Sequence, residues 1–429
     1  MKRIGVRGRY IIKKPDEVIE DSYVIVEGST ISGITEDLPD DIEEVIGDPY
    51  DIVMPGLINT HTHAAMTLFR GIADDLPLMT WLKEHIFPME TRFVDKEFVY
   101  MGSLLAAWEM IRTGTTGFCD GYFFEDQVAR AAKDACIRAW VGEGILDFPT
   151  PSIPDPDEAI LKTREFIERW IDDPLVTPTV FPHAVYTCSP ERLKRAYSLA
   201  EDYDLVFQIH LSETASEVDQ VKSKYKMSPV ALMDSVGCLS ERTLAAHCVV
   251  LSKDDLDILS RRRATVAHNA ESNMKLASGI APVPSMLSSG INVTIGTDGC
   301  ASNNNLDMIG EMSTVAKIHK VARLDATVMD APTVLAMATQ NAARAFNARL
   351  GSLEKGMLAD IVVLDGRSPN MVPNYNPISN VVYAASGLNV KHVIIDGRIV
   401  LKDGICTTLD IESLMSSWNE IQERVRAYR

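Results

Sequence analysis

Between residues 51 and 298, short apolar runs alternate with longer amphipathic segments. The apolar runs predict strands at 51–58, 114–120, 137–145, 176–185, 205–211, 243–250, 264–269 and 291–298. The segments between them have the spacing of helices, as at 98–114, 157–171 and 190–204. Strands and helices that alternate in this way predict an α/β protein with a (β/α)8 barrel of the TIM type, and the span is close to the ~250 residues typical of that fold.

The two ends of the chain have a different pattern. Short β-type runs joined by Gly and Asp turns occur in residues 1–50 and 351–405: SYVIVEG, ADIVVLD and KHVIIDGRIV. Neither end has enough strands for a stable sheet, so we expect both ends to pair into one small β-sandwich. The expected domains are residues 1–53 for the first part of the sandwich, 54–350 for the barrel, and 351–429 for the second part and an amphipathic terminal helix.

Composition limits the classes of function. The chain has 429 residues, 46% of them hydrophobic, and a net charge of -18, which disfavours a nucleic-acid-binding surface. No apolar run is as long as a membrane span, and the N-terminus lacks the apolar segment of a secretory signal. The seven cysteines form no CxxC pair, which suits a reducing compartment. We therefore expect a cytoplasmic protein without nucleic-acid or membrane partners.

Histidines recur at the predicted strand ends, where barrel enzymes carry their chemistry. In MPGLINTHTH, His61 and His63 are two positions apart, so they face the same side of a strand. The later strand ends supply His183, His210, His247, His268 and Asp298. Any one of these histidines could be a structural residue, but their joint placement on one rim predicts a metal site. Three histidines lie elsewhere and are expected to be structural: His85, His319 and His392.

Several long motifs follow one another in an order that resembles the amidohydrolase superfamily, over nearly the whole chain. They are PGLINTHTHAAMTLFRG, HLSE (210–213), HNAESNMKLASG (268–279), TIGTDG (294–299) and the closing GSLEKGMLADIVVLD (351–365). Within the superfamily they are most similar to the deaminases of methylthioadenosine, S-adenosylhomocysteine and 5'-deoxyadenosine. The resemblance implies hydrolytic removal of the 6-amino group of an adenine nucleoside, giving an inosine-type product and ammonia.

The resemblance also implies one divalent metal, most simply Zn²⁺, bound by His61, His63, His210 and Asp298. A bound metal lowers the pKa of water from 15.7 towards ~7, and the resulting hydroxide would attack C6 of the adenine ring. Two-metal members usually have a carbamylated lysine at the end of strand four. Here TVFPHAVYT offers His183 and no lysine, so one metal is expected.

By the same resemblance, Glu213 is the general acid and base that moves a proton to N1 of the ring. His247 would orient the water and, with Asp298, pass its proton to the departing ammonia. The alternative for Glu213 is a charge that only stabilises a helix N-terminus. A non-catalytic barrel that binds a nucleoside would not need this complete set of groups.

Substrate contacts are expected from the segment LPLMTWLKEHIFPMET and from strand four. The resemblance places Glu90 on the ribose hydroxyls and His183 on the purine or ribose, and Trp81 either packs on the 5' substituent or belongs to the core. No arginine occurs in GEGILDFPT at strand three, so a homocysteine carboxylate lacks its usual partner. This favours 5'-deoxyadenosine, methylthioadenosine or adenosine over S-adenosylhomocysteine. Guanine or cytosine deamination and triazine dechlorination are the rival reactions, and relatives suggest a homodimer or homotetramer.

Overall fold

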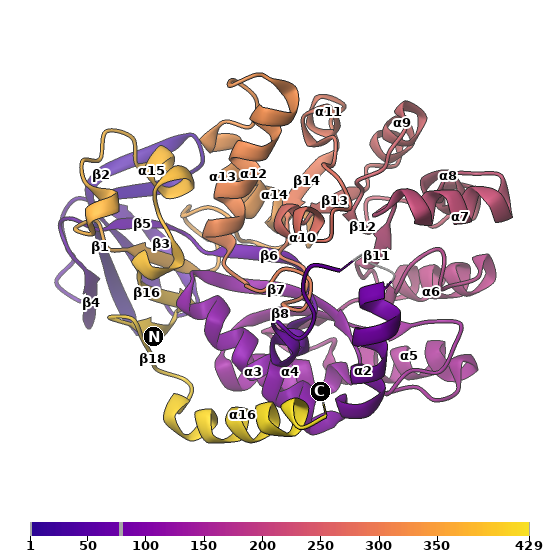
Figure 1. The fold of residues 1–429 in the computed structure, drawn as a ribbon. Helices are drawn as coiled ribbons and strands as arrows, with labels where there is room; N and C mark the ends of the chain where they lie inside the picture. The colour runs from indigo at the N-terminus through magenta and orange to yellow at the C-terminus, as the bar shows by residue number, and fades with distance from the viewer. Residues whose placement is uncertain (1, 77–79, 429) are drawn as a thin grey trace.

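The computed structural model describes residues 2–76 and 80–428, and its centre is a ring of parallel strands (Figure 1). In chain order the barrel strands are β6 (Leu57–Thr62), β7 (Thr115–Tyr122), β8 (Arg138–Ile145), β9 (Val176–Pro178) with β10 (Phe181–Pro182), β11 (Phe207–Leu211), β12 (Thr243–His247), β13 (Thr265–His268) and β14 (Asn292–Ile295). Parallel bridges from Val180 to Phe207 and from Ala184 to His210 join β10 to β11. The Asp298 amide donates to the His61 carbonyl at 2.9 Å, which closes the ring between β14 and β6. The predicted (β/α)8 barrel is confirmed.

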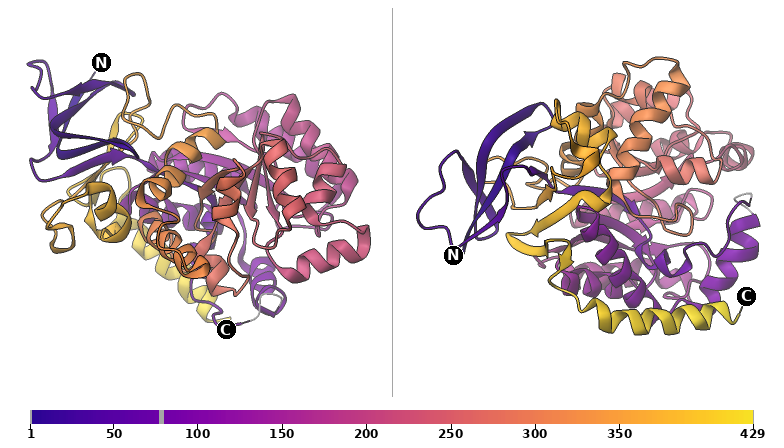
Figure 2. Two further views of the ribbon diagram at one scale, coloured as in Figure 1. Left: turned by 90° about the horizontal axis from the view of Figure 1, so that it is seen from above. Right: turned by 60° about the vertical axis from the view of Figure 1, so that its left-hand side comes forward.

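Helices surround the ring, as both views of Figure 2 show. After β6 come η1 (Ala64–Phe69), η2 (Trp81–Ile86), α2 (Phe87–Phe93) and α3 (Lys96–Arg112), and the later strands are followed by α4 (Glu125–Ala135), η3 (Pro156–Glu158), α5 (Ala159–Trp170), α6 (Pro190–Asp202), α7 (Ala215–Tyr225), α8 (Pro229–Ser235), α9 (Lys253–Arg262), α10 (Ala270–Lys275), α11 (Val283–Ser288), α12 (Met308–Arg323), α13 (Ala331–Ala338) and α14 (Gln340–Ala345). Side chains that accept from a first-turn amide fix several helix starts: Asp95, Ser189, Thr214, Ser228, Ser252 and Asp307. No helix in the described part of the chain is long and apolar enough to cross a membrane.

The predicted first strand, 51–58, was wrong in its extent. Its residues belong to two strands in different sheets: β5 (Ile52–Pro55), which pairs with the end sheet, and β6, which begins the barrel. Gly56 separates them, and a Cβ at this position would overlap the Thr116 side chain. The apolar run is continuous because both strands are buried, so hydrophobicity alone could not locate the change of sheet.

Both chain ends form one sheet beside the barrel, seen at the left of Figure 1. Its strands are β1 (Arg3–Lys14), β2 (Glu17–Glu27), β3 (Thr30–Thr35), β4 (Glu44–Gly47), β5, β15 (Ile361–Leu364), β16 (Val390–Ile395), β17 (Arg398–Lys402) and β18 (Ile405–Cys406). Antiparallel pairing of β5 with β15 joins the two ends, and a bridge from Thr30 to Leu358 joins them again. Residues of both ends share one apolar core, including Val6, Val24 and Val363. The domain boundary at 53/54 stays a prediction, and β5 extends across it.

The C-terminal residues return to the barrel. After η4 (Pro369–Met371), α15 (Pro377–Tyr383) and η5 (Gly387–Asn389), the chain ends in α16 (Ile411–Arg426), which follows the lower edge of Figure 1 beside α3. The Trp418 ring stacks on Trp108 with centroids 5.7 Å apart, and its indole N–H donates to the Met101 carbonyl at 2.9 Å. These contacts explain the apolar stripe of the predicted terminal helix.

A buried ion pair connects the barrel to the end sheet, and breaking it should be costly. Arg138, at the start of β8, donates from Nε and Nη2 to the two carboxylate oxygens of Asp360, both at 3.1 Å. Both side chains are under one-tenth exposed. Arg138→Met leaves a buried carboxylate unpaired, so we expect the free energy of unfolding in urea to fall by about 3–5 kcal/mol. Arg169→Ala, which breaks a more exposed pair with Asp126, should cost about 1 kcal/mol or less. Equal losses in the two variants would contradict this expectation.

Candidate active site

A cavity of about 550 Å³ opens at the C-terminal ends of the barrel strands. The predicted site residues that line it are Trp81, Glu90, His63, His183, His210, Glu213, His247 and Asp298. His61, at the end of β6, is 2% exposed and contacts this set from within the barrel. The structure therefore brings together the predicted metal-binding, catalytic and substrate-binding side chains, whereas His268 of the predicted rim lies apart from them.

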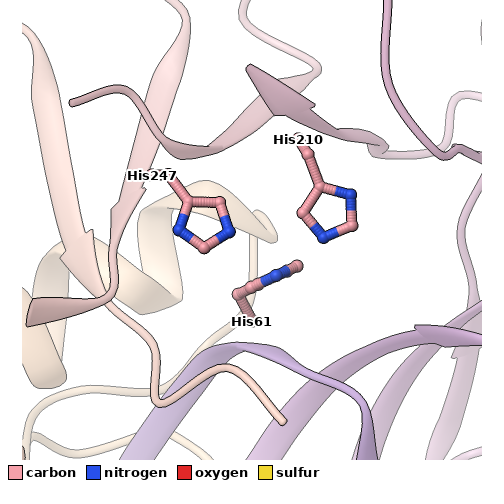
Figure 3. Close-up of side chains that lie close together, drawn as sticks. All are labelled: His61, His210 and His247. Carbon is pink, nitrogen blue, oxygen red and sulfur yellow. The ribbon is translucent and has the colours of Figure 1, made fainter. Parts of the chain in front are cut away.

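Three imidazoles from different strands point toward one another, as Figure 3 shows. Nitrogen atoms of His61, His210 and His247 all lie within 4.8 Å of one another, and so do ligand atoms of His61, His63 and Asp298. His61 belongs to both groups, and its Nε2 is buried without a hydrogen-bond partner. Imidazole and carboxylate groups that converge in this way are typical of a metal centre.

Backbone carbonyls fix how two of these rings are protonated. His63 Nδ1 lies 2.6 Å from the Gly121 carbonyl, and His210 Nδ1 lies 2.8 Å from the His183 carbonyl. A carbonyl only accepts, so each Nδ1 carries the proton and each Nε2 presents a lone pair. The two Nε2 atoms are 3.2 Å apart. Two lone pairs at this distance repel unless a cation lies between them, so the residues fit a bound metal.

Asp298 turns one of its carboxylate oxygens, Oδ1, towards the same imidazoles. Its Oδ2 accepts from Ser272 Oγ at 2.7 Å and from Ser302 Oγ at 2.8 Å. Its Oδ1 lies 3.3 Å from His63 Nε2 and accepts from the Gly299 amide at 2.8 Å. Burial opposes ionisation, but the neighbouring imidazoles, His63 first, outweigh it and hold the pKa of Asp298 below its ordinary range. The carboxylate is therefore available as an anionic ligand.

Glu213 and His247 face each other beside this centre. Glu213 follows the end of β11, and its Oε2 lies 4.0 Å from His247 Nε2. Burial raises the pKa of Glu213 above its ordinary value, while His247 opposes this shift. Burial lowers the pKa of His247, but the Glu213 and Asp298 carboxylates outweigh it and raise this pKa overall. Perturbed pKa values in a facing acid and base are typical of groups that exchange protons.

The outer part of the cavity combines apolar walls with a few polar groups. Its apolar residues include Trp81, Ile86, Phe87, Leu146, Phe148 and Phe181, and no arginine of the described residues lines it. Tyr122 Oη donates to Glu90 Oε1 at 2.7 Å. Burial raises the pKa of Glu90 to about 7, and this hydrogen bond opposes the shift. His183 Nδ1 lies 3.0 Å from Thr187 Oγ1. Glu90 and His183 therefore line an otherwise largely apolar cavity.

One histidine on the predicted rim does not join the site. His268 ends β13, but its Nε2 lies 3.1 Å from His319 Nε2 of α12, and it does not line the cavity. Burial holds the pKa of both rings below the ordinary value. A neutral ring donates through one nitrogen and accepts through the other, so the two Nε2 atoms share one hydrogen bond, while His268 Nδ1 is buried without a partner. The structural interpretation of His319 agrees with this contact.

Sequence reasoning missed the residues that support the ligands. Asp120 Oδ1 accepts from Thr62 Oγ1 at 2.6 Å and from the Ala64 amide at 2.5 Å, which fixes the segment that carries His61 and His63. Asn273 Oδ1 lies 2.9 Å from His247 Nδ1. Asp120 is the last residue of the predicted strand 114–120, and Asn273 lies within the motif HNAESNMKLASG. The sequence therefore offered two signals for these supporting residues: an acidic residue at the end of a predicted strand, and an amide residue within a recognised motif.

The match to the Amidohydrolase family covers residues 52–400. The chain belongs to this family. The match spans the whole barrel and reaches into the end sheet. The resemblance inferred from the motifs is confirmed.

Among named relatives, this amidohydrolase is 53% identical to the 5-methylthioadenosine/S-adenosylhomocysteine deaminase of Syntrophobacter fumaroxidans, over 87% of this chain and 84% of the relative. It is 45% identical to the 5'-deoxyadenosine deaminase of Methanopyrus kandleri, over 99% of both chains. Among solved structures, an adenosine deaminase from Xanthomonas campestris with bound zinc has a TM-score of 0.96 and 37% identity, over 99% of this amidohydrolase and 98% of that chain.

Proposed function

We propose that this amidohydrolase is a metal-dependent deaminase that hydrolyses the 6-amino group of adenine nucleosides. The observation that carries the proposal is the facing pair Glu213 and His247 beside four convergent metal-ligating side chains. The two relatives and the solved neighbour described above are all named as deaminases of adenine nucleosides. A barrel that only bound a nucleoside would not need a buried acid–base pair beside a metal centre.

The proposed ligands of the metal are His61, His63, His210 and Asp298. Two observations support this set: His61 Nε2 is buried without a hydrogen-bond partner, and the Nε2 atoms of His63 and His210 face each other. Zinc is the proposed ion because three imidazoles and one carboxylate suit it, and the Xanthomonas neighbour has bound zinc. When bound, such an ion supplies Lewis-acid polarisation and lowers the pKa of water.

The proton transfers are assigned to the chain's own side chains. Glu213, whose pKa is raised by burial, would deliver a proton to N1 of the purine and so prepare C6 for attack. His247, held by Asn273 at Nδ1, would present Nε2 to the attacking water and hold it in line. Asp298 would take part in returning a proton to the amino group as it leaves. His247 and Asp298 are buried, which limits the access of bulk water to the exchange.

The outer cavity supports a nucleoside with a small or apolar 5' group. Glu90 is proposed to accept from the ribose hydroxyls, His183 to contact the purine or ribose, and Trp81 to pack against the 5' substituent. No arginine of the described residues lines the cavity, so a homocysteine carboxylate would lack a bidentate partner and would have only the single ammonium of Lys83. We therefore place 5'-deoxyadenosine, methylthioadenosine and adenosine ahead of S-adenosylhomocysteine.

A substrate panel tests the proposal. Zinc-loaded protein is mixed with adenosine, 5'-deoxyadenosine, methylthioadenosine, S-adenosylhomocysteine, adenine, guanine, cytosine and a chlorinated triazine, and the release of ammonia, or of chloride from the triazine, is measured. We expect turnover of the nucleosides, with S-adenosylhomocysteine having the lowest kcat/KM of the four. Turnover of guanine or cytosine alone, or of a halogenated triazine, would leave the fold and metal centre intact but overturn the nucleoside assignment.

Tyr122→Phe should weaken nucleoside binding selectively. The variant loses the hydrogen bond that orients Glu90, and a hydrogen bond to a charged group contributes about 1.5–3 kcal/mol. We expect kcat/KM for ribosides to fall about 10-fold or more, mainly through KM, with metal content unchanged. Tyr100→Phe is the matched control, since Tyr100 of α3 donates its hydroxyl to Asp134 of α4 at 2.7 Å and does not line the cavity. A wild-type KM in Tyr122→Phe would exclude this role for Glu90.

Two coarser predictions also remain proposals. We propose a cytoplasmic location, supported by the seven free cysteines at positions 119, 136, 188, 238, 248, 300 and 406. We also propose a homodimer or homotetramer, which light scattering on the purified protein would test.

A further inference from the structure

The strand ends that carry Glu213 and His247 both turn through left-handed backbone. Ser212 has φ of 53°, and His247 and Cys248 have φ of 70° and 47°. None of these residues is a glycine, so each conformation costs of order 1–3 kcal/mol and persists only where surrounding bonds hold it. The two groups proposed to exchange protons are therefore placed by turns that need external support.

Glu217, in the first turn of α7, supports the first of these turns. Its Oε1 accepts from the Ser212 amide at 3.0 Å, and its Oε2 accepts from the Glu213 amide at 2.7 Å. Its own amide donates to Thr214 Oγ1 at 3.2 Å, which fixes the start of the helix. Glu217 is 5% exposed and does not line the cavity, so both carboxylate oxygens serve the backbone.

The same peptide unit is held from its other side by the turn after His247. The Ser212 carbonyl accepts from the Val249 amide at 3.0 Å and from the Val250 amide at 2.9 Å. The peptide unit that joins Ser212 to Glu213 thus donates to Glu217 through its N–H and accepts from the β12 turn through its C=O. A shift of this unit would move both turns together.

We propose that Glu217 is a positioning residue that fixes the separation between the Glu213 carboxylate and the His247 imidazole. The inference deepens the proposed function and rests on it, because it assigns Glu217 to the reaction through its effect on these two groups. A carboxylate in the first turn of a helix also stabilises that helix. That role alone would lower stability without a specific effect on turnover.

Glu217→Gln separates the two roles. The amide retains one acceptor oxygen and turns its NH₂ group towards an N–H donor, so one of the two backbone bonds is lost. We expect kcat to fall about 10- to 100-fold, since displacements near 1 Å cost about 10²-fold. KM should stay within about twofold and zinc content should stay at the wild-type value, because Glu217 contacts neither the cavity nor the proposed ligands.

Asp255→Asn is the matched control. Asp255 is the N3 residue of α9, on the next strand–helix unit; it is 3% exposed, accepts from the Ser252 amide at 2.9 Å and does not line the cavity. Both variants should lower the free energy of unfolding to a similar degree, and only Glu217→Gln should lower kcat. A kcat within twofold of wild type in Glu217→Gln, or an equal loss in both variants, would overturn the inference.

Hydrogen exchange tests, without an activity measurement, whether Glu217 holds the two turns. In Glu217→Gln the amides of Ser212, Glu213, Val249 and Val250 should exchange at least about 10-fold faster than in the wild type, while amides of the β13 strand keep their rates. Unchanged exchange at both turns would refute the inference. If the wild-type protein turned over no nucleoside while both turns still loosened, the proposed function would fail and the structural role of Glu217 would stand.

Discussion

Glu213→Gln should reduce kcat for adenine nucleosides by about 10²- to 10⁴-fold while zinc content stays at the wild-type level. Gln has nearly the same shape but cannot carry the proton that Glu213 is proposed to move, and general acid–base catalysis contributes in this range. Glu213 lies beside the convergent ligands but is not among the side chains that could hold the ion together. Steady-state ammonia release and metal analysis on the same preparation measure both quantities.

Substrate binding gives the control for this variant. Glu213→Gln should still bind a slowly converted nucleoside with a Kd within a few-fold of the wild-type KM, because Glu90, the proposed ribose contact, keeps its hydrogen bond from Tyr122. A variant that retained wild-type kcat would remove Glu213 from the proton pathway. Loss of zinc together with activity would instead indicate a role in holding the metal centre.

Removal of the metal should abolish turnover, and one equivalent of zinc per chain should restore it. Three of the four proposed ligands, His61, His210 and Asp298, are buried. Carbonyls and hydroxyls already orient His63, His210 and Asp298, so the proposed ligands would rebind an ion without refolding. The melting temperature should rise on adding zinc, because an ion that binds only the folded chain stabilises it by RT ln(1 + [L]/Kd). Chelation with dipicolinate, followed by titration with zinc and calorimetry, checks both expectations.

Two substitutions, one at Asp298 and one at its hydrogen-bond donor Ser272, test whether the zinc binds at this centre. Asp298→Ala removes a proposed ligand and should lower zinc affinity by more than about 100-fold. Ser272→Ala removes only one hydrogen bond to that carboxylate, so it should lower affinity by about 10- to 100-fold. Full turnover by the metal-free protein, or equal affinities in all three proteins, would contradict the assignment.

The sequence by itself determined the architecture and most of the proposed site. Buried strands that alternate with amphipathic helices require a barrel, and the C-terminal ends of its parallel strands must meet on one rim. That rule alone places His61, His63, His210, His247 and Asp298 near one another. The motif resemblance to amidohydrolases added the proposed roles, and the family match supports the resemblance.

The tertiary structure decided what each rim residue contacts. The alternation of side chains along a strand predicts which face each residue lies on, but not which neighbours its side chain contacts. His268 could therefore be distinguished from the site histidines only by its contact with His319. The split of residues 51–58 between two sheets likewise depends on pairing with β15, some 300 residues away.

The hydrogen bonds that support the site residues could not be predicted from the sequence for the same reason. The carbonyls that set the tautomers of His63 and His210 belong to neighbouring strands, and the position of those carbonyls is fixed by strand pairing. From the sequence alone, Glu217 would be interpreted as an ordinary acidic residue in the first turn of a helix. Its role became visible only because the fold brings the turn after β12 against the carbonyl of Ser212. Local patterns specify elements, whereas long-range hydrogen bonds form only once those elements are assembled.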